Sequence, residues 1–269
     1  MLITSLSNLR VKTLVALRRR RDRDDQHVML VEGYAEVRLA LSSGQRPQEL
    51  YYCPALMGGR EQLKLVARAE ALRAEVVELS RDVFEKVAYR ESPDGWLAVF
   101  PALDTRLERP ALGTDTLGPD PLILVVEGIE KPGNLGAILR TAEAAGVAAV
   151  VMAESVVDLA NPNVVRASKG ALFAVPVAGV STAEAITWLK QRGFRIVAAE
   201  PAGSMAYTAA RLTGPVALVV GPEQASLSSD WTKAADEFVH IPMVGHSPSL
   251  NVAMAAGLLI YEAVRQRTA

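Results

Sequence analysis

Short and almost uninterrupted apolar runs fill the second half of the chain, and this pattern constrains the fold more than any other feature. After Pro121 the runs read LILVV, VAAVVM, FRIVAA, VALVVG and EFVHIPM, with helical stretches between them. Strands that are apolar on both faces are buried on both faces, which is typical of a parallel sheet covered by helices. We therefore predict a parallel α/β domain over residues 122–269.

The first half of the chain also alternates between short apolar runs and helical patterns. Its segments read HVMLVEG, YAEVRLALSSG, ELYYC, REQLKLVARAEALRA, EVVELS and WLAVF. This alternation predicts a second, smaller α/β domain over residues 1–103. Residues 104–121 have almost no apolar periodicity and contain Pro110, Pro119, Pro121, Gly113 and Gly118. That composition predicts an exposed linker between the two domains.

Composition and charge exclude several classes of protein. The chain has 269 residues, 50% hydrophobic and 22% charged, which favours folded cores over disorder. Its net charge of −1 restricts any contact with nucleic acid to a local patch. A single cysteine, Cys53, and three histidines far apart in sequence predict no disulfide and no metal site. No run approaches the roughly 18 apolar residues of a membrane span, so we expect a cytoplasmic protein without a membrane partner.

The segment VVEGIEKPGNLGAILRTAEAAG, residues 125–146, joins a buried strand to a helix through a loop that contains proline and glycine. Ligands favour such a crevice, but the segment has neither GxGxxG nor GxxxxGK[ST], so it does not predict a nucleotide phosphate site. Asn134 falls near the helix start and Arg140 on its second turn. Arg140 either binds an anionic ligand or pairs with a carboxylate such as Glu143 or Glu154, while Asn134 either serves the site or caps the helix.

Two later loops also follow predicted strands. VALVVGPEQASLS ends a strand at Gly221 and then presents Glu223, with a tight turn as the alternative interpretation. HIPMVGHSPSLNVAMAAG leads from a strand into a loop and a helix, where Ser249 and Asn251 are candidate capping residues. The final segment predicts a closing helix that is apolar for most of its length, with Leu250, Met254, Leu258 and Tyr261 at spacings of three and four.

Taken together, NLGAILRT, GPE, and IPM followed by SLNVA resemble the three motifs of the SpoU (TrmH-like) RNA 2′-O-methyltransferases of the SPOUT superfamily. The motifs occur in that order, each at the carboxyl end of a predicted strand. The resemblance extends from about Leu122 to Arg267 and includes NPNVVRASKGALFAVPV. It implies an α/β domain with a deep trefoil knot, which binds S-adenosylmethionine in the knot and works as a homodimer.

The resemblance also implies which residues form the site. The motif side chains proposed for catalysis fall on Asn134, Arg140, Glu223, Ser249 and Asn251. The cofactor contacts fall on Ala199, Glu200, Gly221, Ile241, Met243 and Leu250. Arg140 acts either as the base that removes the ribose proton or as an electrostatic clamp; a free arginine keeps its proton far above neutral pH, which makes the first role demanding.

The N-terminal domain resembles the substrate-binding extension of this family, which is similar to ribosomal RNA-binding proteins. The matching segments are LVEGYAEVRLAL and ESPDGWLAVF; the second has Ser92 where relatives tend to have threonine. Seven basic against three acidic residues leave a charge of +4 over the first thirty residues. The RNA-binding candidates are Arg18, Arg19, Arg20, Arg21, Arg166 and Lys169. The alternative is a helix whose charges only face solvent.

The expected function is therefore methylation of a ribose 2′-hydroxyl in RNA with S-adenosylmethionine as cofactor. The N-terminal extension favours 23S ribosomal RNA as substrate, and transfer RNA is the alternative. Two other classes stay open at this point. One is a catalytically silent RNA-binding protein with a decayed cofactor pocket, and the other is an unrelated nucleotide-binding α/β enzyme.

Overall fold

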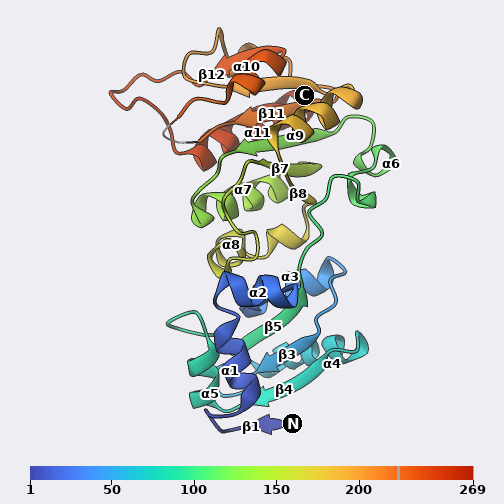
Figure 1. Ribbon diagram of the computed structural model, residues 1–269, viewed down its shortest axis with the longest axis vertical. Helices are drawn as coiled ribbons and strands as arrows, with labels where there is room; N and C mark the ends of the chain where they lie inside the picture. Colours follow the sequence, from blue (N-terminus) through green and yellow to red (C-terminus); the bar gives the residue numbers. More distant parts are fainter. Residues whose placement is uncertain (223–224, 269) are drawn as a thin grey trace. The chain divides into compact units, whose positions relative to one another are not determined.

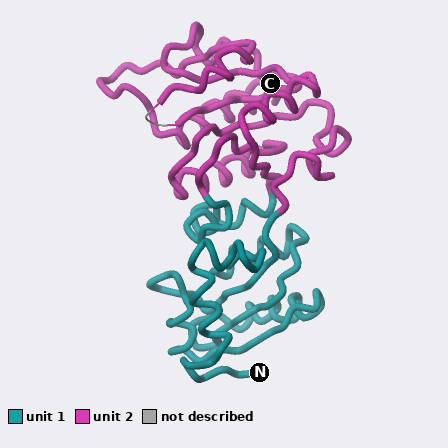
Figure 2. The backbone as a smooth tube through the Cα atoms, in the orientation of Figure 1, with its two compact units in different colours: residues 1–103, 158–174 teal, residues 104–157, 175–269 magenta. Residues whose placement is uncertain are grey.

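The computed structural model describes residues 1–222 and 225–268, and the chain folds into two compact units (Figure 2). Unit 1 comprises residues 1–103 together with 158–174, and unit 2 comprises residues 104–157 and 175–269. Each unit contains one sheet with its own hydrophobic core.

Unit 2 is built on the parallel sheet that the apolar runs predict. Its described strands follow the order β10-β12-β9-β11-β6-β7-β8, and every neighbouring pair is parallel (Figure 1). All residues of β6, β7 and β11 are buried. The bounds are β6 (Leu122–Glu127), β7 (Ala149–Ala153), β8 (Val177–Val180), β9 (Arg195–Ala199), β10 (Met205–Ala206), β11 (Val216–Val220) and β12 (Glu237–His240).

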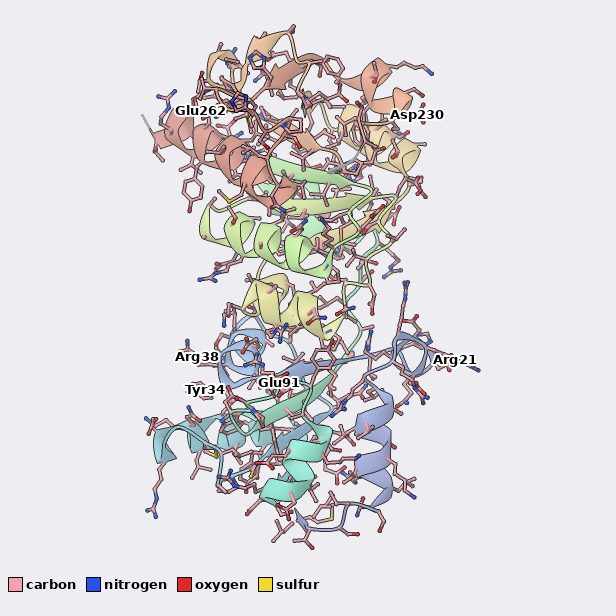
Figure 3. The ribbon with its side chains drawn as sticks, turned by 90° about the vertical axis from the view of Figure 1, so that its left-hand side faces the viewer. Arg21, Tyr34, Arg38, Glu91, Asp230 and Glu262 are labelled. Carbon is pink, nitrogen blue, oxygen red and sulfur yellow. The ribbon has the colours of Figure 1, made fainter. Side chains whose placement is uncertain are left out.

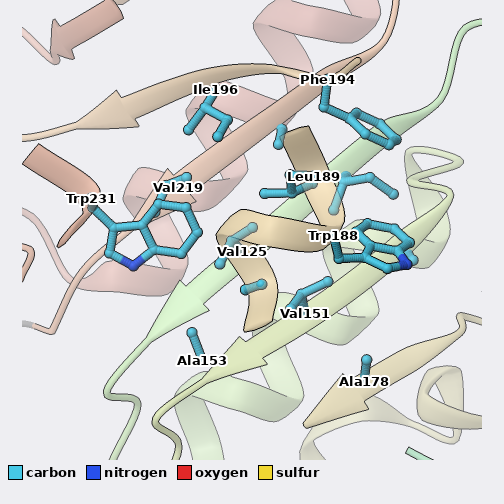
Figure 4. Close-up of a cluster of buried hydrophobic side chains, with 14 of the residues drawn as sticks. Val125, Val151, Ala153, Ala178, Trp188, Leu189, Phe194, Ile196, Val219 and Trp231 are labelled. Atoms are coloured by element: carbon cyan, nitrogen blue, oxygen red, sulfur yellow. The ribbon is translucent and has the colours of Figure 1, made fainter. Parts of the chain in front are cut away.

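Helices cover both faces of this sheet. On one face Trp188, Leu189 and Trp231 pack on alternate strand residues such as Val125 and Val219 (Figure 4). The longer helices α7 and α11 contact each other and lie against β6, β7 and β11. Figure 3 shows α11 and α10 on opposite sides of the sheet. The helical elements are η2 (Pro110–Leu112), α6 (Thr114–Leu117), α7 (Pro132–Ala144), α9 (Thr182–Gln191), η4 (Tyr207–Ala209), α10 (Ser229–Ala234) and α11 (Val252–Thr268).

The closing helix forms as predicted, but the spaced apolar residues lie on its exposed side. The side chains buried on α11 include Val252, Ala256, Leu259, Ile260 and Ala263. Met254, Leu258 and Tyr261 are 62%, 38% and 50% exposed, which leaves an apolar stripe at the surface of unit 2. Leu250 precedes the helix. The helix therefore has two apolar faces, and the sheet covers one of them.

Unit 1 contains a mixed sheet in the order β1-β4-β3-β5-β2, in which β5 runs antiparallel to β2 and β3. Helices α1 and α5 pack together, and Leu14, Leu17 and Phe84 join the core against Leu97 and Tyr51. The strands are β1 (Leu2–Ile3), β2 (Val28–Glu32), β3 (Glu49–Tyr52), β4 (Glu75–Leu79) and β5 (Trp96–Pro101). The helical elements are α1 (Leu9–Ala16), α2 (Arg20–Gln26), α3 (Tyr34–Ser42), η1 (Arg60–Leu63), α4 (Lys64–Ala71), α5 (Arg81–Val87), α8 (Pro162–Ser168) and η3 (Ala171–Phe173).

The segment 158–174 connects β7 to β8 of unit 2 but belongs to unit 1. The Asn163 amide donates to the Tyr89 hydroxyl at 3.1 Å, and the rings of Phe173 and Phe100 lie 5.7 Å apart. Gly170 has a φ of +85°, and a Cβ there would lie 3.1 Å from the Cα of Glu36. A side chain at position 170 would therefore obstruct the approach of this segment to α3.

The compact units thus divide the chain differently from the expected domains. Residues 122–269 were expected to form one continuous domain, but 158–174 pack in unit 1. Residues 104–121, expected as an exposed linker, pack with unit 2, where Leu107 and Leu112 are buried in the core. Isolated leucines can anchor a segment without apolar periodicity, so the sequence pattern did not reveal this packing. The trefoil knot implied by the resemblance stays a prediction.

Arg23 attaches the segment 158–174 to unit 1 through a buried ion pair with Asp158. The Arg23 side chain is 2% exposed, and its guanidinium also donates to the carbonyls of Leu17 and Arg18 at 2.9 Å. Removal of one partner from a buried ion pair leaves an uncompensated charge. We expect Arg23→Met to lower the free energy of unfolding by about 3 kcal/mol in urea denaturation.

Arg20→Met is the matched control, because Arg20 forms an exposed pair with Asp24 on the same helix. We expect this change to cost less than about 1 kcal/mol. Equal losses in the two variants would contradict the structural role assigned to Arg23.

Candidate active site

The three motif segments meet at the carboxyl edge of the sheet in unit 2. Strands β6 and β11 pair in parallel from Leu122 with Val216 to Val126 with Val220, so they end at the same edge. Gly128 follows β6 with a φ of +59°, and a Cβ there would lie 3.8 Å from the side chain of Pro222, which follows β11. The loops that lead from β6 and β11 therefore start side by side, as expected for loops that leave adjacent parallel strands.

The first and third motifs meet through two asparagines. The Asn251 amide donates to the Asn134 side-chain oxygen at 3.2 Å, although 117 positions separate the two residues. Asn251 also accepts a hydrogen bond from the backbone N–H of Ala253 at 3.0 Å, which is a capping contact at the start of α11. Asn134 is the third residue of α7, whose cap position is Lys131, so the capping interpretation of Asn134 is wrong.

Arg140 lies on α7 with an exposed side chain. It makes no hydrogen bond or ion pair with any residue in the described ranges, and the structure does not bring it within bonding distance of the other described motif residues. The carboxylate of Glu154 instead accepts the backbone N–H of Thr182 at 3.0 Å. The alternative of a salt bridge to Glu143 or Glu154 is therefore wrong, and the guanidinium is accessible to an external anion.

Two further residues were expected from the motifs, Ser249 and Glu223. Ser249 is exposed, and its carbonyl accepts a hydrogen bond from the Ser247 hydroxyl at 3.0 Å. Glu223, expected from the second motif, lies outside the described residues. The structure therefore joins Asn134 to Asn251 by a direct contact, and it places Ser249 just before the helix that Asn251 caps.

The expected cofactor residues follow three neighbouring strands. Ala199 ends β9 and Glu200 comes after it, Gly221 follows β11, and Ile241 follows β12, in the sheet order β12-β9-β11. Most of these residues are half-buried, while Met243 is 37% exposed. S-adenosylmethionine presents an apolar adenine face and polar edges. Half-buried Ile241 and Leu250, beside backbone groups at strand ends, fit both features.

The sequence analysis missed Glu127, a buried carboxylate at the carboxyl end of β6. Its side chain is 6% exposed and accepts hydrogen bonds from Thr182 and Ser228. The signal for it was present, because Glu127 is the charged residue that ends the apolar run LILVVE. Charged residues are seldom buried unless they have partners, so a glutamate in this position indicates a specific contact.

The RNA-binding candidates all fall in unit 1, and most of them have internal partners. The Arg18 guanidinium donates to the carbonyls of Lys86 and Ala88 at the end of α5. Ion pairs join three further arginines to aspartates of the same region, namely Arg19 to Asp22, Arg20 to Asp24 and Arg21 to Asp25.

Arg166 and Lys169 belong to the α8 region of unit 1. The exposed Arg166 side chain donates to the Asn163 side-chain oxygen at 3.0 Å. Lys169 ends α8 in the left-handed conformation with a φ of +54°. These two residues therefore lie in the same compact unit as the arginines of α2, although the sequence places them within the methyltransferase match.

The described residues form neither a metal cluster nor a membrane-spanning helix. Residues 1–222 and 225–268 contain no group of three or more His, Cys, Asp or Glu side chains arranged to hold a metal ion. No helix in the same ranges is both long enough and apolar enough to cross a membrane.

Comparison with known proteins gives a family match for each half of the chain. Residues 121–261 match the model of the SpoU rRNA methylase family, and residues 8–98 match the MRM3-like substrate-binding domain. A curated relative, the 23S rRNA (guanosine-2′-O-)-methyltransferase RlmB of Ralstonia nicotianae, is 32% identical over 240 residues. That alignment covers 89% of this chain and 96% of the relative.

Two solved structures are similar over nearly the whole chain. A crystal structure of an RNA 2′-O ribose methyltransferase is 39% identical with a TM-score of 0.85, and the match covers 100% of both chains. The AdoMet-bound rRNA methyltransferase from Sinorhizobium meliloti is 30% identical with a TM-score of 0.88, covering 98% of this chain and 97% of the other. The carboxyl-edge site and these matches together identify the chain as a member of the SpoU rRNA methylase family.

Proposed function

We propose that this protein transfers the methyl group of S-adenosylmethionine to a ribose 2′-hydroxyl of RNA, and that 23S ribosomal RNA is its substrate. The observation that carries the proposal is the contact between Asn134 and Asn251, which joins the first and third motifs at the carboxyl edge of the sheet. The substrate is supported by the match to a substrate-binding domain and by relatives that act on 23S rRNA. Transfer RNA is the alternative substrate, and either RNA places the reaction in the cytoplasm.

The bound cofactor supplies an electrophilic methyl group, and the residues of this chain align the reactants. Backbone groups near Gly221 would hold the polar edges of the adenine, and Ile241 and Leu250 would pack on its faces. Arg140 binds an RNA phosphate beside the target ribose and stabilises the negative charge that develops on the 2′-oxygen. Arg140 as the proton acceptor is the second candidate role, and the exposed position of its guanidinium on α7 leaves it accessible for either role.

The other motif residues support this arrangement. Asn134 and Ser249 orient Arg140 or the ribose, and Asn251 braces the cofactor pocket through its contact with Asn134. Glu223 fixes the second loop or an arginine. Ala199, Glu200 and Met243 complete the cofactor contacts.

Unit 1 supplies the RNA contacts outside the methyl-transfer site. The residues that bind phosphates, and so position the RNA without reading its sequence, are Arg166, Lys169, Arg18, Arg19, Arg20 and Arg21. RNA phosphates must compete with Asp22, Asp24 and Asp25 for Arg19, Arg20 and Arg21. We therefore place the larger share of this binding on Arg166 and Lys169, whose side chains are not in ion pairs among the described residues.

The active form is a homodimer that buries the exposed stripe of α11. Met254, Leu258 and Tyr261 form a row of large apolar side chains at spacings of four and three. Contiguous exposed apolar surface of this kind marks interaction sites.

Arg140→Ala tests the assigned chemistry. We expect turnover in a tritium-transfer assay with 23S rRNA to fall roughly 100-fold or more, as for the loss of an oxyanion donor. Cofactor affinity should stay within about twofold, because Arg140 contacts the RNA rather than S-adenosylmethionine. Arg211→Ala, at an exposed arginine that donates to Thr213, should retain full turnover. Equal turnover in Arg140→Ala and wild type would contradict the assignment.

The same assay decides between the two RNA substrates, and binding of labelled S-adenosylmethionine decides between an enzyme and a silent RNA-binding protein. Methylation of 23S rRNA but not of transfer RNA is the expected result. Methylation of transfer RNA alone would favour the alternative substrate, and a wild-type protein that binds no labelled S-adenosylmethionine would favour the silent RNA-binding protein.

Leu258→Glu tests the homodimer. A charge in the middle of the stripe should convert a dimer of wild-type protein into a monomer in analytical ultracentrifugation, because burial of an unpaired carboxylate is costly. Leu9→Glu is the control, since Leu9 is 78% exposed on α1 and lies outside the stripe. A wild-type protein that stays monomeric at micromolar concentration would overturn this part of the proposal.

A further inference from the structure

Leu227 and Ser228, which directly precede α10, are held by carboxylates at the ends of the two strands that flank β11. In the sheet order β9-β11-β6, the central strand β11 lies between β9 and β6. Glu127 is the last residue of β6, and Glu200 is the first residue after β9. Both side chains accept hydrogen bonds from the end of the segment that runs from Gly221 to α10.

Glu127 makes three contacts that use both of its carboxylate oxygens. Oε2 accepts the backbone N–H of Ser228 at 2.8 Å, and Oε1 accepts the hydroxyls of Ser228 at 2.7 Å and Thr182 at 2.9 Å. The side chain is 6% exposed, so water contributes little to its solvation. Hydrogen bonds to an ionised acceptor are stronger than neutral ones, and these three compensate the burial of the charge.

Glu200 fixes the preceding residue. Its Oε1 accepts the backbone N–H of Leu227 at 2.9 Å, and the Leu227 side chain is buried in the core of unit 2. A Cβ at Gly221 would lie 3.0 Å from Cδ2 of Leu227, so the start of the segment packs closely against its end. Gly221 and Leu227 are therefore packed neighbours.

We propose that Glu127 is a positioning residue for S-adenosylmethionine, which acts by holding Ser228 and thereby fixing Gly221 at the cofactor site. The inference rests on the proposed function, because Gly221 is a cofactor contact only in that function. Glu127 touches no reacting atom. Its effect passes through Ser228, Leu227 and Gly221.

The hydrogen bonds of Glu127 predict that this residue affects the affinity for the cofactor and not only the stability of the fold. The partners of Glu127 are neutral donors, so an apolar side chain at this position leaves no uncompensated charge in the core. A leucine at position 127 would continue the apolar run of β6, but it would leave the Ser228 backbone N–H without its acceptor. A glutamine would keep one oxygen for that N–H, and its amide group could donate to the two hydroxyls.

The test compares Glu127→Leu and Glu127→Gln in the full-length protein by calorimetric titration with S-adenosylmethionine. We expect the Kd to rise about tenfold or more in the leucine variant, since an unsatisfied buried donor is costly, and to stay within about threefold in the glutamine variant. In steady-state methylation, the leucine variant should raise KM for S-adenosylmethionine by more than it lowers kcat.

Asp236→Leu is the matched control. The Asp236 carboxylate accepts the backbone N–H of Ile196 at 2.8 Å near the amino end of β9, which is the opposite edge of the same sheet. This variant should lower the temperature of unfolding while the Kd stays within about twofold of wild type. Ser228→Ala removes only one hydroxyl, so it supplies a second test if Glu127→Leu does not fold; we expect a rise in Kd of about threefold.

Two results would overturn the inference while leaving the proposed function intact. The first is a wild-type Kd in Glu127→Leu, or in Ser228→Ala where the leucine variant does not fold, and the second is an equal loss of affinity in Asp236→Leu. Absence of cofactor binding by the wild-type protein would instead overturn the proposed function, and the inference with it.

Discussion

Burial of the unit 2 sheet on both faces is the constraint on which the site depends. Every residue of β6, β7 and β11 is buried, so the middle of these strands offers no place for a ligand. Polar groups appear where the strands end, and because neighbouring strands are parallel they all end at one edge. Glu127, Glu200 and Gly221 occupy that edge, and Asn134 and Asn251 belong to the loops and helices that follow it.

Some arginines use their charge inside the fold, and others keep it accessible to a ligand. Arg23 is buried against Asp158, and Arg18 binds the carbonyl groups at the end of α5, so both stabilise unit 1. Arg140 has no partner in the described ranges, which matches the requirement of a group that binds an RNA phosphate. A count of basic residues in the sequence treats these cases alike, although only an accessible guanidinium contributes to RNA binding.

The family motifs predicted some residues of the site but not the residues that hold its loops in place. The motif segments placed Asn134 and Asn251 in one site, and in the structure the two side chains are joined by a hydrogen bond. Glu127 and Ser228 were not predicted, because 101 positions separate them in the sequence and only the fold brings them together. The same reason explains why the sequence pattern did not reveal that residues 158–174 pack with unit 1.

The sequence by itself determined the α/β class, the parallel sheet and the loops that carry the chemistry. These features follow from local hydrophobic patterning and from motif order, which are written along the chain. Only the tertiary structure decided which face of α11 is covered, which arginines are already paired, and which carboxylates hold the segment after β11. Each of these depends on contacts between residues far apart in sequence, where burial and hydrogen-bond geometry select among partners that the sequence leaves equivalent.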